Sequence, residues 1–299
     1  CFSGAIKSTS ESIDNGELCE IYCDEQFLGI GYYNGNSQIR VRVLTRIKQN
    51  IDKDFFKNRF ETLKKEKEQF LLFTNSYRLV FGESDNLPGL IVDVYDKVVV
   101  LQIHTLGMEK LKNYIVEALT EVLKPFSIYE KSDLSVHSSE GLPKGNNSLL
   151  YGKLISPVEI KENGYKFSID IVNGQKTGFF IDQRENRLCL SKYTLNKKVL
   201  NCFCYTGGFS VYAAKNAKTV TSVDISKTAI EIAMTNFKIN LLDIDKNHFI
   251  TQDVFEYIKN VKEQEFDMII LDPPSFAKNK NQIKNAIKAY ITINSLALQ

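Results

Sequence analysis

The second half of the sequence predicts an α/β fold of the Rossmann-like, doubly wound kind. From Lys198 onward, strand-forming runs alternate with helical periodicity, which is the pattern of a parallel sheet covered by helices. The first strand, 199–203, is followed by the glycine pair Gly207-Gly208, and an acidic residue ends or follows each of the next three strands. Because ligands of such folds bind outside the carboxyl ends of the strands, the series predicts a nucleotide-like cofactor at that edge.

The composition is that of a globular protein with two or three domains. The chain has 299 residues, 43% of them hydrophobic and 25% charged, and its net charge of +2 leaves any binding of nucleic acid to local basic patches. No apolar run is long enough for a membrane span and no signal peptide opens the chain, so we expect a cytoplasmic protein without a membrane partner. The six cysteines and three histidines form no Cys/His cluster, and we expect neither a disulfide scaffold nor a metal site.

Short β runs bounded by turn residues fill the first 48 residues. They cover 20–23, 27–33 and 38–44. Apolar and polar residues alternate in the third run, which predicts one buried face and one face that carries Arg40 and Arg42. That basic face is either simply solvated or in contact with phosphates.

A helix and several strands are predicted for residues 49–155. Aromatic and leucine side chains recur at helical spacing over 51–72. The turn residues of 83–89 separate two strands. The elements expected next are a strand at 98–103, a helix at 108–123 and a short strand at 127–131.

Residues 156–299 open on a predicted hairpin. Its strands are 157–161 and 165–172, joined by Asn163-Gly164, which is the strongest short hairpin signal. The alternating elements that follow are strands at 199–203, 219–223, 248–250 and 267–271, and helices from 209, at 226–240, at 254–262 and from about 281. The chain opens without Met and stops inside a helical pattern, so we expect the sequence to be truncated at both ends.

The glycine turn favours S-adenosylmethionine (SAM) over NAD as the cofactor. Asp224 lies 17 residues beyond Gly207, a spacing that suits a ribose-binding acid in either case. The turn lacks the G-x-G-x-x-G pyrophosphate cradle, which SAM does not need. The segment Asp272-Pro-Pro-Ser-Phe276 ends the fourth strand. Its aspartate can accept a hydrogen bond from a nucleobase edge, and Phe276 can stack on a flipped base.

These motifs resemble the large-subunit ribosomal RNA methyltransferase I family, over almost the whole chain. The specific matches are Gly174-Gln-Lys-Thr-Gly-Phe-Phe-Ile-Asp-Gln-Arg184 and Leu200-Asn-Cys-Phe-Cys-Tyr-Thr-Gly-Gly-Phe-Ser210, and Phe2–Ile6 and Gly82–Leu90 also fit. The resemblance implies a class I SAM-dependent methyltransferase domain preceded by a small β-rich PUA domain and a central α+β domain. The implied boundaries are 1–48 for a PUA-like RNA-binding domain truncated at its N-terminus, 49–155 for the central α/β domain, and 156–299 for the hairpin with a C-terminally truncated methyltransferase domain.

The resemblance also implies roles for single residues. Asp224 would bind the ribose hydroxyls, Asp253 with Val254 would hold the adenine, and Gly207 would pack against the cofactor. The other residues expected at the SAM pocket are Lys176, Phe180, Asp182, Arg184, Phe203, Tyr205 and Asp272. The residues expected to position the target base are Asp272, Pro273 and Pro274. Competing structural explanations are a core position for Phe203, an ion pair with Asp182 for Arg184 and a helix N-cap for Asp253.

Family members methylate C5 of a cytosine in large-subunit (23S) ribosomal RNA. C5 is a poor nucleophile until a thiolate adds to C6. The resemblance implies that this cysteine lies beyond residue 299, so we expect the chain alone to be inactive. Cys202 and Cys204 are expected to be packing residues.

Two other functions stay open. Ser275 stands where some relatives have Lys, which leaves guanine-N7 methylation of ribosomal RNA as an alternative that needs no cysteine. A non-catalytic RNA-binding ribosome-assembly factor is the alternative outside the enzymes. A homodimer is compatible with the sequence, although no pattern predicts one.

Overall fold

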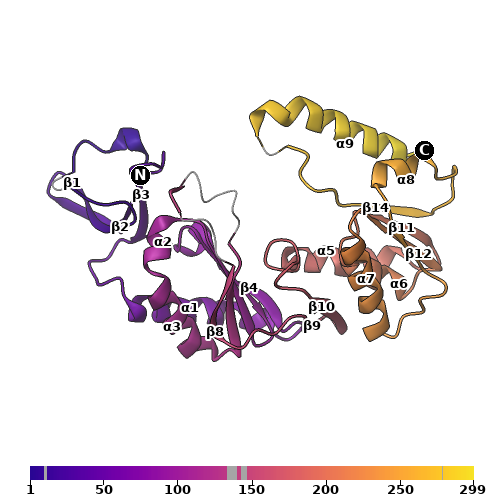
Figure 1. The fold of residues 1–299 in the computed structure, drawn as a ribbon, viewed down its shortest axis with the longest axis horizontal. Helices are drawn as coiled ribbons and strands as arrows, with labels where there is room; N and C mark the ends of the chain where they lie inside the picture. Colours follow the sequence, from indigo (N-terminus) through magenta and orange to yellow (C-terminus); the bar gives the residue numbers. More distant parts are fainter. Residues whose placement is uncertain (10–11, 133–139, 143–146, 278) are drawn as a thin grey trace. The chain divides into compact units, whose positions relative to one another are not determined.

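The chain folds into two compact units, described here from a computed structural model (Figure 1). The structure describes residues 1–9, 12–132, 140–142, 147–277 and 279–299. One unit comprises Cys1–Ile160 with Ile169–Ile181, and the other comprises Lys161–Ser168 with Asp182–Gln299. None of the described helices has the length and apolar character that a membrane crossing requires.

The first unit opens on an antiparallel three-stranded sheet, as predicted. Its strands are β1 (Leu18–Cys23), β2 (Gln26–Tyr33) and β3 (Val41–Thr45). The third strand is shorter than expected because Ile39 pairs with Phe2 in an isolated bridge before the ladder begins. Arg42 is half-buried, and its guanidinium lies 3.0 Å from Glu83 and 3.0 Å from Glu140. The basic face expected there is therefore neutralised at Arg42 by acids of the same unit.

A mixed five-stranded sheet with three helices completes the first unit. Its order is β4-β5-β6-β7-β8, with β6 and β7 parallel and the other neighbours antiparallel. The strands are β4 (Ser76–Phe81), β5 (Leu90–Tyr95), β6 (Val98–Ile103), β7 (Ser127–Glu130) and β8 (Ser148–Gly152). The helices are α1 (Lys53–Lys67), α2 (Leu106–Lys110) and α3 (Lys112–Leu123).

Two elements of the first unit, a helix and a strand, differ from the prediction. The expected helix over 51–72 ends at Lys67 and continues only as a 3₁₀ turn, Glu68–Phe70. Its start is well defined, because the Asp52 side chain accepts hydrogen bonds from the main-chain N–H of Asp54 and Phe55. Strand β8 was not predicted, because it is an edge strand with mostly exposed residues and no inward-facing apolar alternation.

The predicted hairpin is present and joins the two units. It consists of β9 (Val158–Glu162) and β10 (Tyr165–Ile169). Asn163 and Gly164 both have positive φ, 49° and 84°, as a two-residue type I′ turn requires. Strand β10 stops before the expected Val172 because the Asp170 carboxylate accepts hydrogen bonds from the main-chain N–H of Val172 and Asn173, which turns the chain.

The second unit contains the parallel sheet predicted from the alternating pattern. Its order is β13-β12-β11-β14. The strands are β11 (Lys198–Cys202), β12 (Thr219–Asp224), β13 (His248–Thr251) and β14 (Met268–Leu271). The helices are α5 (Arg184–Leu190), α6 (Gly208–Ala214), α7 (Lys227–Ile239), α8 (Val254–Lys259) and α9 (Ile283–Ala297). Helix α5 was not predicted.

The two faces of this sheet are covered differently. Leu200 and Cys202 lie in an apolar cluster with Ile293 of α9 and Ile258 of α8. Asn201, between them in β11, points to the other face, where its amide donates to the Ser210 hydroxyl of α6 at 2.8 Å. The sheet is therefore a layer between helices, as in doubly wound folds. The domain boundaries at 48/49 and 155/156 stay predictions.

Candidate cofactor site at the carboxyl edge of the parallel sheet

The strand register brings the predicted site residues of the second unit to one edge. Cys202 pairs with Val223 of β12 and with Leu271 of β14, and Asp224 pairs with Thr251 of β13. The segments that begin at Phe203, Asp224, Asp253 and Asp272 therefore leave the sheet at neighbouring positions. Strand β11 is the point where the strand order reverses, and ligands of open α/β sheets bind in the crevice at such a point.

The loop between β11 and α6, residues 203–207 and called here the glycine loop, has an unusual backbone. Phe203, Tyr205 and Gly207 all have left-handed φ values, 57°, 48° and 76°. For a residue with a side chain this conformation costs about 1–2 kcal/mol, and such strain tends to be kept at ligand sites. The loop is tied down by the N–H of Cys204, which donates to Val223 O at 3.0 Å, and by the N–H of Gly207, which donates to Cys204 O at 2.9 Å.

Gly207 is required by geometry as well as by its φ. A Cβ atom at this position would lie 2.9 Å from the Cβ of Ala233 on α7. The glycine loop therefore packs directly against α7, and any larger residue at 207 would push the two apart. The packing seen for Gly207 is against α7, and its contact with a cofactor stays a prediction.

Asp224 links the glycine loop to the end of β12. Its Oδ2 accepts from the main-chain N–H of Tyr205 at 2.9 Å, and its Oδ1 accepts from the N–H of Ser226 at 2.9 Å. A carboxylate has about four lone-pair sites, so each oxygen can accept a further hydrogen bond from a ribose hydroxyl. Asp224 thus organises the loop and keeps acceptor capacity at the predicted cofactor edge.

Asp253 and Val254 lie at the start of α8. Asp253 is an N-cap, because its Oδ1 accepts from the N–H of Glu256 at 3.1 Å. The competing structural explanation for this residue therefore holds, and its contact with adenine stays a prediction. The side chain of Val254 is only 2% exposed and belongs to the apolar cluster. Because this side chain is buried, any contact of Val254 with the cofactor would involve its main-chain atoms.

Four aromatic rings meet at the same edge and are called here the aromatic cluster: Phe203, Phe255, Phe276 and Tyr290. The ring centres of Phe276 and Tyr290 are 4.6 Å apart, and those of Phe255 and Phe276 are 5.8 Å apart. Phe203 lies 6.4 Å from both Phe255 and Phe276. Phe203 is half-buried against the apolar cluster rather than fully in the core. The rings meet tilted or edge-on, at interplanar angles from 53° to 75°, and the stacking of a base on Phe276 stays a prediction.

The Asp-Pro-Pro segment directly follows β14. Asp272 and Pro274 are exposed and Pro273 is half-buried. Two prolines in succession fix the backbone of this exposed segment. Its contact with the target base stays a prediction.

The remaining predicted residues are divided between the two units. Asp182 is exposed, and Arg184 at the start of α5 forms an ion pair with Glu185 at 3.0 Å. Lys176 and Phe180 belong to the first unit, where the Lys176 ammonium lies 4.6 Å from the centre of the Phe180 ring. Their contribution to the cofactor site in the second unit stays a prediction.

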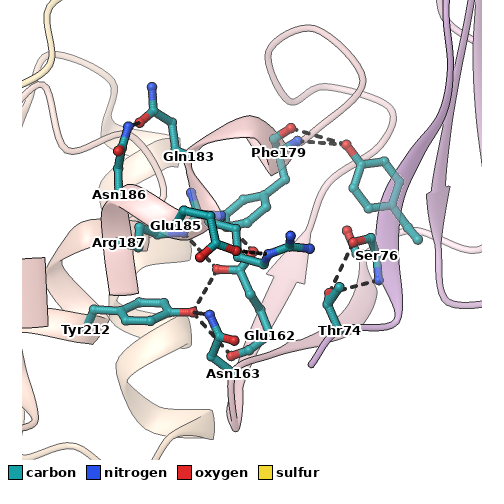
Figure 2. A network of polar contacts seen from close by, with 12 residues as sticks. Thr74, Ser76, Glu162, Asn163, Phe179, Gln183, Glu185, Asn186, Arg187 and Tyr212 are labelled. Carbon is teal, nitrogen blue, oxygen red and sulfur yellow. Dashed lines mark hydrogen bonds and ion pairs between the residues drawn. The ribbon is translucent and has the colours of Figure 1, made fainter. Parts of the chain in front are cut away.

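Sequence reasoning missed the buried ion pair that fixes α5. The Glu162 carboxylate accepts from Arg187 Nε at 2.8 Å and Nη2 at 2.7 Å, and from the Tyr212 hydroxyl at 2.9 Å. Asn163 in turn donates to the Tyr212 oxygen at 3.0 Å. Figure 2 shows this group, which joins the hairpin, α5 and α6. Burial, then the charge of Glu162, raises the pKa of Tyr212.

The two cysteines of this edge are packing residues in the structure. Burial raises the pKa of the Cys202 thiol to about 12. Burial, and to a smaller degree the charge of Asp224, raises the pKa of Cys204 well above its usual value. Because the thiolate is the nucleophilic form, neither is suited to attack a base.

The native protein should therefore show two classes of cysteine towards iodoacetamide at pH 7.5. Cys1, Cys23 and Cys189 are exposed and should be alkylated, whereas Cys202 and Cys204 should stay unmodified until urea unfolds the chain. Peptide mass spectrometry after a timed reaction measures this. Rapid labelling of Cys202 or Cys204 in the folded protein would contradict the assignment.

Thr206 contains a buried polar atom without a visible function. Its side-chain oxygen has no hydrogen-bond partner among the described residues. We expect Thr206→Val, which keeps the shape, to leave the free energy of unfolding unchanged or raise it by up to about 1 kcal/mol. Urea unfolding measures this. Ser210→Ala is the matched control and should destabilise the protein, because its hydroxyl bonds to Asn201 and Ser222. A clear loss of stability in Thr206→Val would show that the hydroxyl has a partner.

Comparison with known proteins gives two matching family descriptions. An S-adenosylmethionine-dependent methyltransferase family matches residues 129–292, and a PUA-like domain matches residues 1–46. The ribosomal RNA large subunit methyltransferase I of Aeromonas salmonicida is 43% identical over 306 residues, which cover 100% of this chain and 77% of that protein. The protein of the same description from Aliivibrio fischeri ES114 is also 43% identical, over 309 residues and with the same coverage.

Solved structures agree with this match. A crystal structure of a putative methyltransferase complexed with SAH has a TM-score of 0.77 and 30% identity, and covers 89% of this chain and 70% of that chain. A putative SAM-dependent methyltransferase from Streptococcus mutans has a TM-score of 0.76 and 27% identity, and covers 92% of this chain and 74% of that chain.

Proposed function

We propose that this chain transfers the methyl group of SAM to C5 of a cytosine in 23S ribosomal RNA. The chain belongs to the ribosomal RNA large subunit methyltransferase I family. SAM as cofactor and large-subunit ribosomal RNA as substrate follow from the family. The choice of cytosine C5 is the proposal. The carrying observation is the common edge of β11, β12 and β14, where the glycine loop, Asp224 and Asp272 leave the sheet together.

In this proposal the residues of the edge bind and orient the two substrates. SAM supplies a methyl group on a positively charged sulfur. Asp224 binds the ribose of the cofactor with the acceptor capacity that Tyr205 and Ser226 leave over. Asp272 accepts a hydrogen bond from the N4 amino group of the cytosine, and the aromatic cluster offers a face for the flipped base. The PUA-like residues 1–46 bind RNA.

Methylation at C5 also needs a nucleophile that adds to C6 and a base that later removes the C5 proton. Cys202 and Cys204 do not suit the first task, because both thiols are buried and their pKa values are raised. We assign neither task to a described residue.

Guanine-N7 methylation is the second candidate. N7 already carries a lone pair, so its methylation requires no cysteine nucleophile. Ser275, whose hydroxyl donates to Ala277 O at 2.8 Å, stands within the segment that would contact the base.

A methyl-transfer assay with nucleoside analysis separates these functions. Full-length protein, tritiated SAM and large-subunit RNA from a strain that lacks the gene are incubated together, and the RNA is digested for mass spectrometry. Labelled 5-methylcytosine is the expected result. Labelled 7-methylguanosine would replace the proposed base, and tight RNA binding without any label would favour an assembly factor. Fractionation of cells should find the protein in the cytoplasm, which we also propose.

A further inference from the structure

Asn236 of α7 connects the glycine loop to the hairpin through its side chain. The residue is fully buried. Its Nδ2 donates to the main-chain oxygen of Thr206 at 2.8 Å, and its Oδ1 accepts from the main-chain N–H of Ser168 in β10 at 2.8 Å. These partners fix the orientation of the amide, because an N–H can only donate and a carbonyl can only accept.

The position of Thr206 makes this contact important for the glycine loop. Thr206 lies between Tyr205 and Gly207, which both have left-handed φ values of 48° and 76°. A peptide flanked by two such residues can turn its carbonyl in more than one direction, and the direction seen is the one that Asn236 holds. The Thr206 side-chain oxygen forms no hydrogen bond with a described residue. The side chain of Thr206 therefore does not hold this peptide in place of Asn236.

A second asparagine, Asn240, is hydrogen-bonded to β10 as Asn236 is, but it does not contact the glycine loop in this way. Asn240, the C-cap of α7, lies one turn after Asn236. It accepts from the N–H of Lys166 at 2.9 Å and donates to Lys166 O at 2.7 Å. It therefore fastens the same strand, β10, to the same helix. No hydrogen bond between Asn240 and the glycine loop is among those of the described residues. The chain thus provides its own matched control.

We propose that Asn236 is a positioning residue for the cofactor: its amide holds the Thr206 carbonyl so that the glycine loop keeps, before binding, the shape that receives SAM. The inference rests on the proposed function only in placing SAM at this edge. It does not depend on which base is methylated. An ordered loop lowers the entropic cost of binding, so the loss of this hold should appear in affinity.

The test compares Asn236→Asp and Asn236→Ala with Asn240→Ala in the full-length protein. Asn236→Asp retains an acceptor for Ser168 and replaces the donor to Thr206 by an oxygen. Isothermal titration calorimetry with SAH should show an affinity about 10- to 100-fold lower for both Asn236 variants, the range for a buried group left unpaired. Asn240→Ala should stay within about threefold of the wild type, although it loses two hydrogen bonds to β10.

Kinetics separate positioning from general loss of structure. With large-subunit RNA as substrate, the Asn236 variants should show a raised KM for SAM and a kcat close to that of the wild type, because saturating cofactor restores the loop. Partial unfolding would instead lower kcat and leave KM unchanged. Hydrogen exchange in Asn236→Ala should be faster at residues 204–207 than in Asn240→Ala.

The proposal is overturned if Asn236→Asp binds SAH as tightly as the wild type, or if Asn240→Ala weakens binding to the same degree. If Asn236→Asp does not fold, the affinity and exchange of Asn236→Ala decide. Failure of the cytosine proposal would appear elsewhere, as the wrong labelled nucleoside with unchanged SAH binding.

Discussion

Arg187→Met is expected to lower the free energy of unfolding by about 3–5 kcal/mol, the range for breaking a buried ion pair on one side. The side chains of Arg187 and Glu162 are 2% and 1% exposed. Without the guanidinium, the Glu162 carboxylate keeps the Tyr212 hydroxyl as a donor but loses its counter-charge in a region that water does not reach. Urea unfolding followed by circular dichroism measures the change. A loss below about 1 kcal/mol would contradict the structure of this pair.

Two controls show whether the uncompensated charge is the cause. Adding Glu162→Gln to Arg187→Met removes the remaining charge, so the double variant should be more stable than the sum of the single effects predicts. Lys259→Met breaks an ion pair with Glu256 whose side chains are 50% and 61% exposed, and should change the stability by less than about 1 kcal/mol. Additive single effects would show that Glu162 and Arg187 act independently.

This network also shows why α5 could not be predicted from the sequence. Helix α5 has seven residues, and the buried one among them is Arg187. Apolar periodicity identifies a helix by its inward-facing hydrophobic side chains, and here the inward-facing side chain is charged. Its burial depends on Glu162, which lies 25 positions away along the chain. By contrast α7, which buries Ala229, Ile230, Ala233 and Phe237, is visible in the pattern.

The candidate site likewise contains some features that the sequence predicts and others that it does not. The edge that carries Asp224 and Asp272 follows from strand order, because acidic residues that follow parallel strands must meet. The left-handed conformations of Phe203 and Tyr205 do not follow, since residues with side chains rarely adopt them and only Gly207 signals one. Asn236 reads as an ordinary helix residue, and its role appears only when β10 and the glycine loop are seen on either side of it.

Asp224→Ala is expected to weaken SAH binding by about 1–3 kcal/mol, the cost of leaving buried partners unpaired. Two effects contribute: the ribose hydroxyls lose their acceptor, and the N–H groups of Tyr205 and Ser226 lose theirs. The variant Asp224→Asn separates these two effects in part, because its side chain keeps a single acceptor oxygen. That oxygen can accept a hydrogen bond from one of these donors. We expect its affinity to lie between those of the alanine variant and the wild type. Calorimetry with SAH measures all three.

A carboxylate at the opposite end of β11 provides the control. Asp267 accepts from the main-chain N–H of Lys198, the first residue of β11, at 2.7 Å. Asp267→Ala therefore removes a comparable strand-end hydrogen bond, but at the amino edge of the sheet, and should leave SAH affinity unchanged. If Asp224→Ala also leaves the affinity unchanged, Asp224 is only a loop anchor. If both variants weaken binding alike, the effect belongs to β11 as a whole rather than to the carboxyl edge.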